Sequence, residues 1–322
     1  RFMAKDSTAN RIWGSVFGGS EDGHVLGNTK VKYISGYTGT KGTSSWDGNI
    51  FGGGRNFHHN NYAAGRVQGN VSVHMCGGHL FGSIFGGGRF AITGCGFMGF
   101  NLPDDQGRYT AMLDGDDHGN ITVKVNGGTI GNPNVIKTFT QYSMGDVFGG
   151  GKGDIGGIAL DGHPKASALL LAMSKNTTVI IADSIDGGEI KFSPRILGSV
   201  FGGGEVANVG NYRWKTGTYS DTDETIGDIE SWDESVVCNV TVSGGTIGAD
   251  VAQMRVEMES VDHNYNLKYC DDRGHVFGGG EGLSGANPYS YDTINPYSGT
   301  GTAGILNNKS LLDLMATVRE TH

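Results

Sequence analysis

The sequence predicts an all-β fold, a parallel β-solenoid (β-helix) with variable insertion arms and one or two short helices. Three observations favour it: an excess of Gly, a Phe-Gly-Gly block that recurs six times, and alternating strand patterns between these blocks. Of the 322 residues, 58 are Gly and 6 are Pro, whereas Gly usually makes up about 7% of a chain. Because each interior Gly costs a helix about 1 kcal/mol, long helices are disfavoured. No strict Gly-X-Y period appears, which excludes collagen.

The first block reads Gly-x-[Val/Ile]-Phe-Gly-Gly-[Gly/Ser]. Equivalent residues in stacked coils lie about 4.8 Å apart, so we expect the six Phe rings to stack as an internal ladder. The glycines beside each ring leave room for it and let backbones approach closely. The positions assigned to this structural repeat, rather than to ligand binding, are Phe17, Phe51, Phe85, Phe148, Phe201, Phe277, Gly52, Gly53, Gly86, Gly87, Gly149, Gly150, Gly202, Gly203, Gly278 and Gly279.

The second block alternates β-branched and polar residues and ends in Gly-Gly. Its copies are Val71–Gly78, Ile121–Gly128, Val240–Gly245 and a looser one, Val179–Gly188. Period-two alternation indicates a strand with one buried face. Asn126-Gly127 and Asp186-Gly187 resemble hairpin turns. However, only Thr-Ile-Gly follows Gly128 or Gly245, too short a segment to pair back, so we predict that each Gly-Gly is a corner leading to another sheet.

Constant blocks joined by connections of variable length are typical of a solenoid. The six Phe residues lie 34, 34, 63, 53 and 76 residues apart. We therefore predict one repeat array over 1–322, an excerpt of a longer chain, with coils around 11–54, 70–88, 120–151, 178–204 and 238–280. The predicted helices are 164–175 and 309–318. The alternative is a kelch-like β-propeller, which also has Gly-Gly strands and repeats near ~50 residues.

Charge and cysteine content exclude several classes of protein. The net charge is −9 and no basic stripe appears, so no nucleic-acid partner is expected. No apolar run approaches the ~20 residues of a membrane-spanning helix. The four cysteines are consistent either with free thiols or with the pairs Cys76–Cys95 and Cys238–Cys270.

The candidate chemical motifs are weak. Asp114–Asp117 resembles a calcium loop but lacks the EF-hand spacing, so we interpret it as a solvated turn. Asp221–Glu224 and Asp271–Asp272 receive the same interpretation. The pairs His58/His59 and His74/His79 are read as surface or strand-face residues rather than metal ligands. The sequence therefore assigns no catalytic, metal-binding or cofactor-binding residue.

An enzyme remains the alternative, because parallel β-helices also carry polysaccharide lyases and hydrolases. Acid–base glycosidases need two carboxylates about 5–9.5 Å apart. The sequence predicts no such pair, since carboxylates are not expected at an equivalent place in two successive strand blocks.

Two motifs alternate along the chain: Val-x-Val-x-Gly-Gly-Thr-Ile-Gly (121–131 and 240–248) and Gly-x-Val-Phe-Gly-Gly-Gly. This alternation resembles the glycine-rich repeat proteins of Bacteroidetes, which are expected to be surface or secreted β-solenoids. The segment Val200–Gly210 is especially typical of them. The resemblance implies an extracellular or cell-surface, structural or adhesin-like role and no catalytic residues. The expected partners are other protein chains or surface glycans, with self-association or a larger assembly also consistent. The Tyr-rich arms are the predicted recognition surfaces, at Tyr212, Tyr219, Tyr289, Tyr291 and Tyr297.

Overall fold

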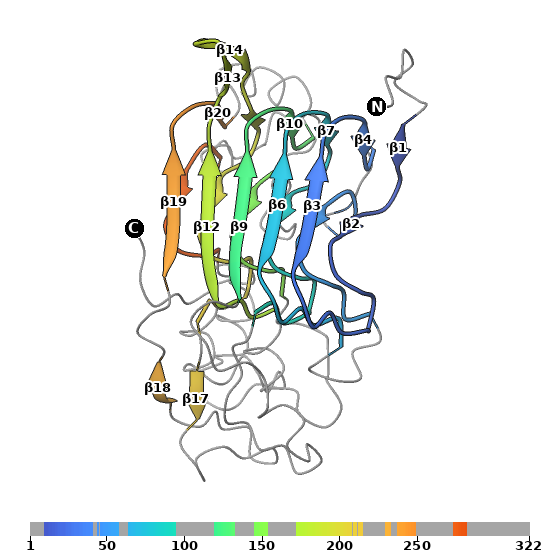
Figure 1. Ribbon diagram of the computed structural model, residues 1–322, viewed down its shortest axis with the longest axis vertical. Coiled ribbons are helices and arrows are strands. Elements are labelled where there is room, and N and C mark those ends of the chain that lie inside the picture. Colours follow the sequence, from blue (N-terminus) through green and yellow to red (C-terminus); the bar gives the residue numbers. More distant parts are fainter. Residues whose placement is uncertain are drawn as a thin grey trace, which may run out of the picture.

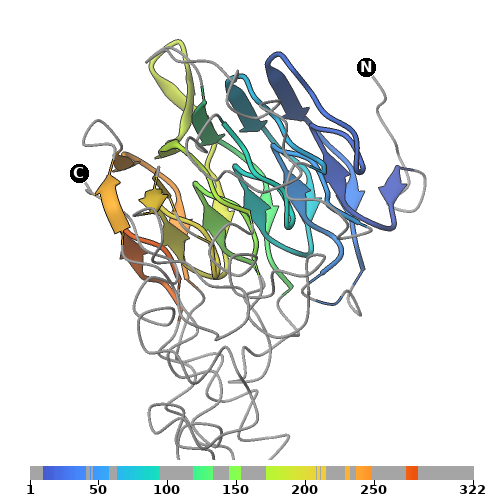
Figure 2. The same ribbon diagram turned by 90° about the horizontal axis from the view of Figure 1, so that it is seen from below.

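The fold is an all-β parallel solenoid with three sheets. The computed structural model describes residues 10–40, 44, 46–57, 64–94, 119–132, 145–153, 172–207, 209–210, 212–214, 229–232, 237–248 and 273–281, which form 21 strands and, within these ranges, no helix. Strands pair in parallel within each of these three sheets, as predicted for a solenoid. This pairing excludes the alternative of a propeller, whose blades are antiparallel. Figure 2 shows the coils stacked one behind the next.

Two of the sheets consist of strands of two residues. The first short sheet contains β1 (Arg11–Ile12), β4 (Tyr37–Thr38), β7 (His79–Leu80), β10 (Thr129–Ile130), β15 (Arg195–Ile196) and β20 (Thr246–Ile247). The second short sheet contains the Phe blocks: β2 (Val16–Phe17), β5 (Ile50–Phe51), β8 (Ile84–Phe85), β11 (Val147–Phe148), β16 (Val200–Phe201) and β21 (Val276–Phe277). Each sheet takes one strand from each coil.

The third sheet, here the long sheet, faces the viewer in Figure 1. Its strands are β3 (Thr29–Tyr33), β6 (Val71–Met75), β9 (Asn120–Val125), β12 (Asn176–Ile181) and β19 (Cys238–Val242). These are the alternating segments of the sequence, and in β3 and β6 every second residue is buried. The predicted strands therefore have one face on the core and one on solvent.

The lumen between the sheets is filled by aliphatic side chains. One cluster joins Val73 and Val123 of the long sheet, Ile130 of the first short sheet, and Ile84 and Val147 of the second. The last two immediately precede a Phe in their strands. Because successive residues of a strand point to opposite faces, the Phe rings lie on the other face of the second short sheet.

The six Phe rings form a single stacked column, a cluster of their own outside the lumen. Neighbouring ring centroids are 4.8 to 5.1 Å apart and the planes are within 14° of parallel. Phe51, Phe85 and Phe148 are fully buried, whereas Phe277, at the end of the column, is 45% exposed. The ladder is thus buried as expected, but it stacks outside the aliphatic core rather than within it.

The corner prediction is right at most Gly-Gly pairs and wrong at one. After β9, Gly127-Gly128 leads directly to β10 in another sheet. Gly187-Gly188 instead forms the turn of an antiparallel hairpin between β13 (Ser184–Asp186) and β14 (Glu189–Phe192). Both of its glycines have positive φ, 59° and 82°, as a two-residue type I′ turn requires, whereas only the second glycine of the 127–128 corner does.

Two further expectations are corrected. The last four residues of the predicted helix 164–175 are described and are not helical: Ala172 has φ of 55° and Ser174 forms β-bridges with Thr93 and Val209. The remainder of that helix and the helix 309–318 lie outside the described residues. The predicted coil 11–54 contains strands of two successive coils, because β1 pairs with β4 and β2 with β5.

A second hairpin joins β17 (Tyr212–Trp214) to β18 (Ile229–Trp232).

Replacement of Gly86 by Ala tests the close approach of the coils. A Cβ at this position would collide with the carbonyl oxygen of Gly149 and lie 2.5 Å from Cγ2 of Ile121. We expect the free energy of unfolding to fall by about 1–3 kcal/mol, as for other overpacked sites. Gly27→Ala is the matched control, since nothing lies within 4 Å of its added Cβ. Equal stability of the two variants in chemical denaturation would show that the coils are not closely packed here.

Candidate functional site

A column of ionisable residues follows the Phe ladder along one corner of the solenoid. In every coil the fourth residue after the Phe is charged, and parallel β-bridges join these residues from each coil to the next. We call this the corner column; its members are Glu21, Arg55, Arg89, Lys152, Glu205 and Glu281. Three cations occupy its middle, and carboxylates occupy both ends. It concentrates more charge than any other row of stacked residues in the described part of the chain.

Trp46 covers the cations in the middle of the column. Its ring centroid lies 4.9 Å from the guanidinium carbon of Arg89 and 4.7 Å from Nζ of Lys152. The Nη1–H of Arg89 also donates to the backbone oxygen of Trp46 at 3.0 Å. Burial, with the like charge of Arg55, lowers the pKa of Arg89 to about 10. At neutral pH the group therefore remains a cation held against the indole face, a favourable cation–π geometry.

Lys152 and Glu205 form a buried ion pair. Nζ of Lys152 donates to Oε2 of Glu205 at 2.5 Å, and the two side chains are 0% and 2% exposed. Burial raises the pKa of the Glu205 carboxyl to about 6, against the opposing pull of Lys152 and with a further upward contribution from Glu281. Burial of such a pair costs desolvation that offsets much of its attraction, and the loss of one partner leaves an unpaired buried charge, which destabilises the fold.

The succession of Glu205 and Glu281 corrects one sequence expectation. These carboxylates occupy equivalent places on successive coils, each four residues after its Phe. A raised carboxyl pKa beside a second carboxylate is the pattern of a general acid. However, Glu205 is engaged by Lys152 and almost completely buried, so a polymer in solution does not reach it in this conformation. The geometry therefore favours a structural role for the corner column.

Two polar ladders, which were not predicted from the sequence, hold the coils in register. In the first, Oδ1 of Asn28 accepts from the backbone N–H of Asn70, and Oδ1 of Asn70 from that of Asn120. Asn176 continues this ladder, its Oδ1 accepting from the N–H of Val237. The signal was an Asn at or just before the start of each of these long strands.

The second ladder immediately precedes the Val/Ile-Phe pairs. Oγ of Ser15 accepts from the N–H of Asn49, Oδ1 of Asn49 from the N–H of Ser83, and Oγ of Ser83 from the N–H of Asp146. Asp146 and Ser199 extend it to the following coils. The signal was a small polar residue at the same place in these blocks. Each side chain thereby satisfies a backbone donor of its neighbour.

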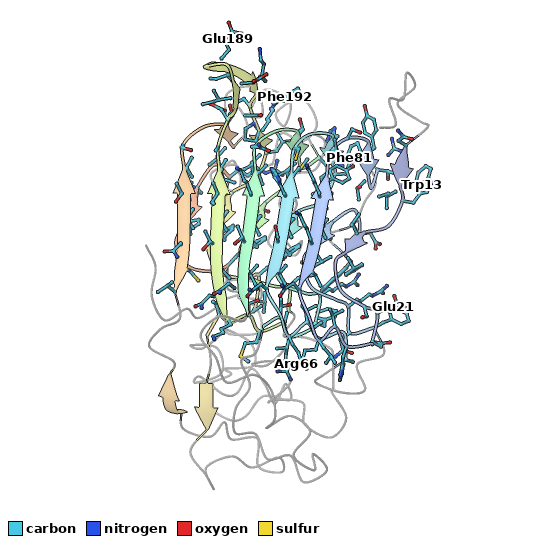
Figure 3. All side chains as sticks on the ribbon, viewed as in Figure 1. Trp13, Glu21, Arg66, Phe81, Glu189 and Phe192 are labelled. Carbon is cyan, nitrogen blue, oxygen red and sulfur yellow. The ribbon has the colours of Figure 1, made fainter. Side chains whose placement is uncertain are left out.

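An aromatic group lies on the outer face of the first short sheet. Arg11, Tyr37 and His79 are consecutive partners across β1, β4 and β7. The guanidinium of Arg11 lies 5.2 Å from the ring centroid of Tyr37 and 5.3 Å from that of Trp13, which is 71% exposed. Figure 3 labels Trp13 beside β1. Exposed aromatic rings of this kind favour contacts with partners.

The other residues that the sequence singled out are not brought into one site. His74 contacts Oδ1 of Asn126 at 2.9 Å, and His79 contacts the carbonyl oxygen of Gly131 at 3.0 Å, on different sheets. In the ranges described, no three His, Cys, Asp or Glu residues are arranged to hold a metal ion. Of Tyr212, only the backbone is described. Outside the described residues lie His58, His59, Asp114–Asp117, Asp221–Glu224, Asp271–Asp272, Tyr219, Tyr289, Tyr291 and Tyr297.

Two of the four cysteines are described, and both are free. Cys238 is fully buried, and burial raises the pKa of its thiol to about 11. It is therefore an unreactive thiol at neutral pH. Cys76 is partly exposed. Cys95 and Cys270 lie outside the described residues.

Comparisons with known proteins give no match: no family model, no curated protein and no solved structure is similar to this chain at a significant level. Within the described residues, no helix is long and apolar enough to cross a membrane.

The buried carboxyl of Glu205 predicts a specific pH dependence of stability. Its pKa rises from 4.5 in the unfolded chain to about 6 in the folded one, so between these values the folded chain binds more protons. The contribution of Glu205 to the free energy of unfolding is therefore present below pH 4.5 and decreases as the pH rises through this window. Glu205→Gln should flatten the pH profile there in chemical denaturation. Glu189→Gln, on the exposed hairpin, controls for loss of a carboxylate; parallel profiles for wild type and Glu205→Gln would contradict the prediction.

Proposed function

We propose that the chain is an extracellular, structural and adhesin-like β-solenoid segment whose projecting parts make contacts with protein or glycan partners. The rigid stack of coils would act as a scaffold, and the insertions as the contact surfaces. The resemblance of its repeat blocks to the glycine-rich surface or secreted proteins of Bacteroidetes supports this proposal. Loops on a rigid scaffold are the usual carriers of recognition.

The observation that carries the proposal is the β13–β14 hairpin. It projects beyond the ends of the long strands, and Figure 3 labels Glu189 and Phe192 on it. Its apolar side chains remain in solvent: Ile185 is 66% exposed, and Ile190 and Phe192 are each 62% exposed. An isolated two-stranded hairpin is only marginally stable in water. A partner that covers these three apolar side chains would therefore stabilise the hairpin and bury its exposed apolar surface.

The second candidate function is a carbohydrate-active enzyme, a polysaccharide lyase or hydrolase. The observation in its favour is the pair Glu205 and Glu281 with the raised pKa of Glu205. The burial of Glu205 and its ion pair with Lys152 favour the structural role instead.

Substitution of the apolar hairpin residues tests the adhesin-like function. We expect the variant Ile185→Thr, Ile190→Thr, Phe192→Thr to reduce the number of protein-coated beads that adhere to an epithelial cell monolayer at least tenfold. The reason is that the variant lacks the apolar surface that a partner would cover. Its free energy of unfolding should change by less than about 0.5 kcal/mol per site, since these side chains are exposed. Leu26→Thr, at a residue that is 70% exposed elsewhere, is the control. Wild-type beads that fail to adhere, or a variant that adheres equally well, would refute the proposal.

An activity assay separates the two functions. We expect the purified protein to release no reducing or unsaturated ends from a panel of neutral and acidic polysaccharides. Release of such ends, together with its abolition in Glu281→Gln, would replace the adhesive function with the enzymatic one. Glu21→Gln, at the opposite end of the corner column, is the matched control for that substitution.

A further inference from the structure

The strands of the long sheet carry cations on their outer face and contain no carboxylate. In β3, β6, β9 and β12 the outward positions alternate with buried ones, and β19 pairs with β12 in the same register. We call these outward positions the basic face. Its basic members are Lys30, Lys32, His74 and Lys124, and its other members are Ser, Thr and Asn residues and Ile180.

The charge of this face is opposite to that of the chain. The whole chain carries a net charge of −9. In contrast, the five strands of the long sheet contain three Lys and one His and no Asp or Glu. The carboxylates whose side chains the structure describes lie on the corner column, on the hairpin and its flanking residue, in the second polar ladder and in turns: Glu21, Asp22, Asp47, Asp146, Asp183, Asp186, Glu189, Glu205 and Glu281. The basic face therefore presents an attractive surface to an anion within an acidic protein.

The register of the strands arranges this face in two straight rows. In one row Lys32 pairs with His74, and His74 with Lys124. In the other, Ser72, Thr122 and Thr178 are consecutive partners. Neighbours in a row lie about 4.8 Å apart, a spacing close to the length of one pyranose residue in an extended chain. Along the solenoid axis, the exposed Lys32 and Lys124 thus lie two coils apart, and a hydroxyl recurs in each coil from Ser72 to Thr178. This arrangement suits the recurring carboxylates and hydroxyls of an acidic polysaccharide.

The composition of the face favours sugar over other anionic polymers. None of its outward positions is aromatic, so it offers no platform on which nucleic-acid bases stack. Ile180 is its one large apolar residue, which is too little for insertion into a membrane interface. Lys30, Lys32 and Lys124 are exposed, and the hydroxyl residues between them donate and accept hydrogen bonds.

We propose that the basic face binds an acidic polysaccharide, with the lysine ammonium groups pairing with its carboxylates and Ser72, Thr122 and Thr178 bonding its hydroxyls. The chain of sugars runs along the solenoid axis, across the strands. This inference deepens the proposed contact function by naming one class of partner and its surface. It rests on that function only in placing the protein where such glycans occur.

The test measures binding to immobilised polygalacturonate, with neutral dextran as the reference polymer. Wild type should bind polygalacturonate at least tenfold more tightly than dextran, and the difference should shrink as the salt concentration rises from about 0.05 to 0.5 M, because exposed charges are screened. The variant Lys30→Gln, Lys32→Gln, Lys124→Gln should lose at least tenfold in affinity. The single change Lys124→Gln should lose severalfold, whereas Arg195→Gln, at an exposed cation of the first short sheet, should stay within twofold of wild type.

Three results would overturn the proposal: equal binding to dextran and polygalacturonate, wild-type affinity in the triple variant, or tighter binding to single-stranded DNA or phosphatidylserine vesicles than to polygalacturonate. The hairpin variant Ile185→Thr, Ile190→Thr, Phe192→Thr distinguishes this failure from that of the proposed function. Hairpin-dependent cell adhesion without polygalacturonate binding would refute the basic face alone. Polygalacturonate binding without hairpin-dependent adhesion would refute the role of the hairpin alone.

Discussion

The hydrogen bond from the glycine after each Phe to the Phe carbonyl of the next coil is the interaction on which the rest of the structure depends. The N–H of Gly52 donates to the oxygen of Phe85, and that of Gly86 to the oxygen of Phe148, each at 2.9 Å. The same bond repeats along the whole second short sheet. A side chain at these glycines would collide with the backbone of the neighbouring coil. Glycine is thus required here by the distance between coils rather than by a special φ.

This spacing places residues at equivalent positions of successive coils against one another. Phe rings stack on Phe rings outside the lumen, and aliphatic side chains fill the lumen. At the corners, side-chain oxygens of the two polar ladders accept hydrogen bonds from backbone N–H groups of the next coil. The same alignment brings Arg55, Arg89 and Lys152 into one column, where Trp46 and flanking carboxylates offset their repulsion. The repeat therefore brings the charges of the corner column together, and neighbouring residues compensate for their repulsion.

In a scaffold of this kind, the residues that stabilise the stack differ from those to which we assign the proposed contacts. The lumen, the Phe column and the ladders stabilise each coil against the next, so insertions between blocks change length without disturbing the stack. The β13–β14 hairpin is such an insertion, and its apolar residues contribute nothing to the core. The outer face of the long sheet is part of the repeat itself, and its regular spacing follows from the same coil-to-coil hydrogen bonding.

The sequence by itself determined the solenoid, because a repeat constrains structure wherever it recurs. The Phe blocks predicted the ladder, and Val71–Gly78 and its copies predicted long strands that turn at Gly-Gly into another sheet. It did not reveal that Asp186-Gly187-Gly188 forms a hairpin, because a corner and a type I′ turn use the same residues and differ in where the following strand finds a partner. Nor did it reveal that Glu205 faces Glu281, or that Lys32, His74 and Lys124 form one row. Such residues lie tens of positions apart along the chain, and only the stacking register of the coils, fixed by backbone hydrogen bonds between them, decides which ones meet.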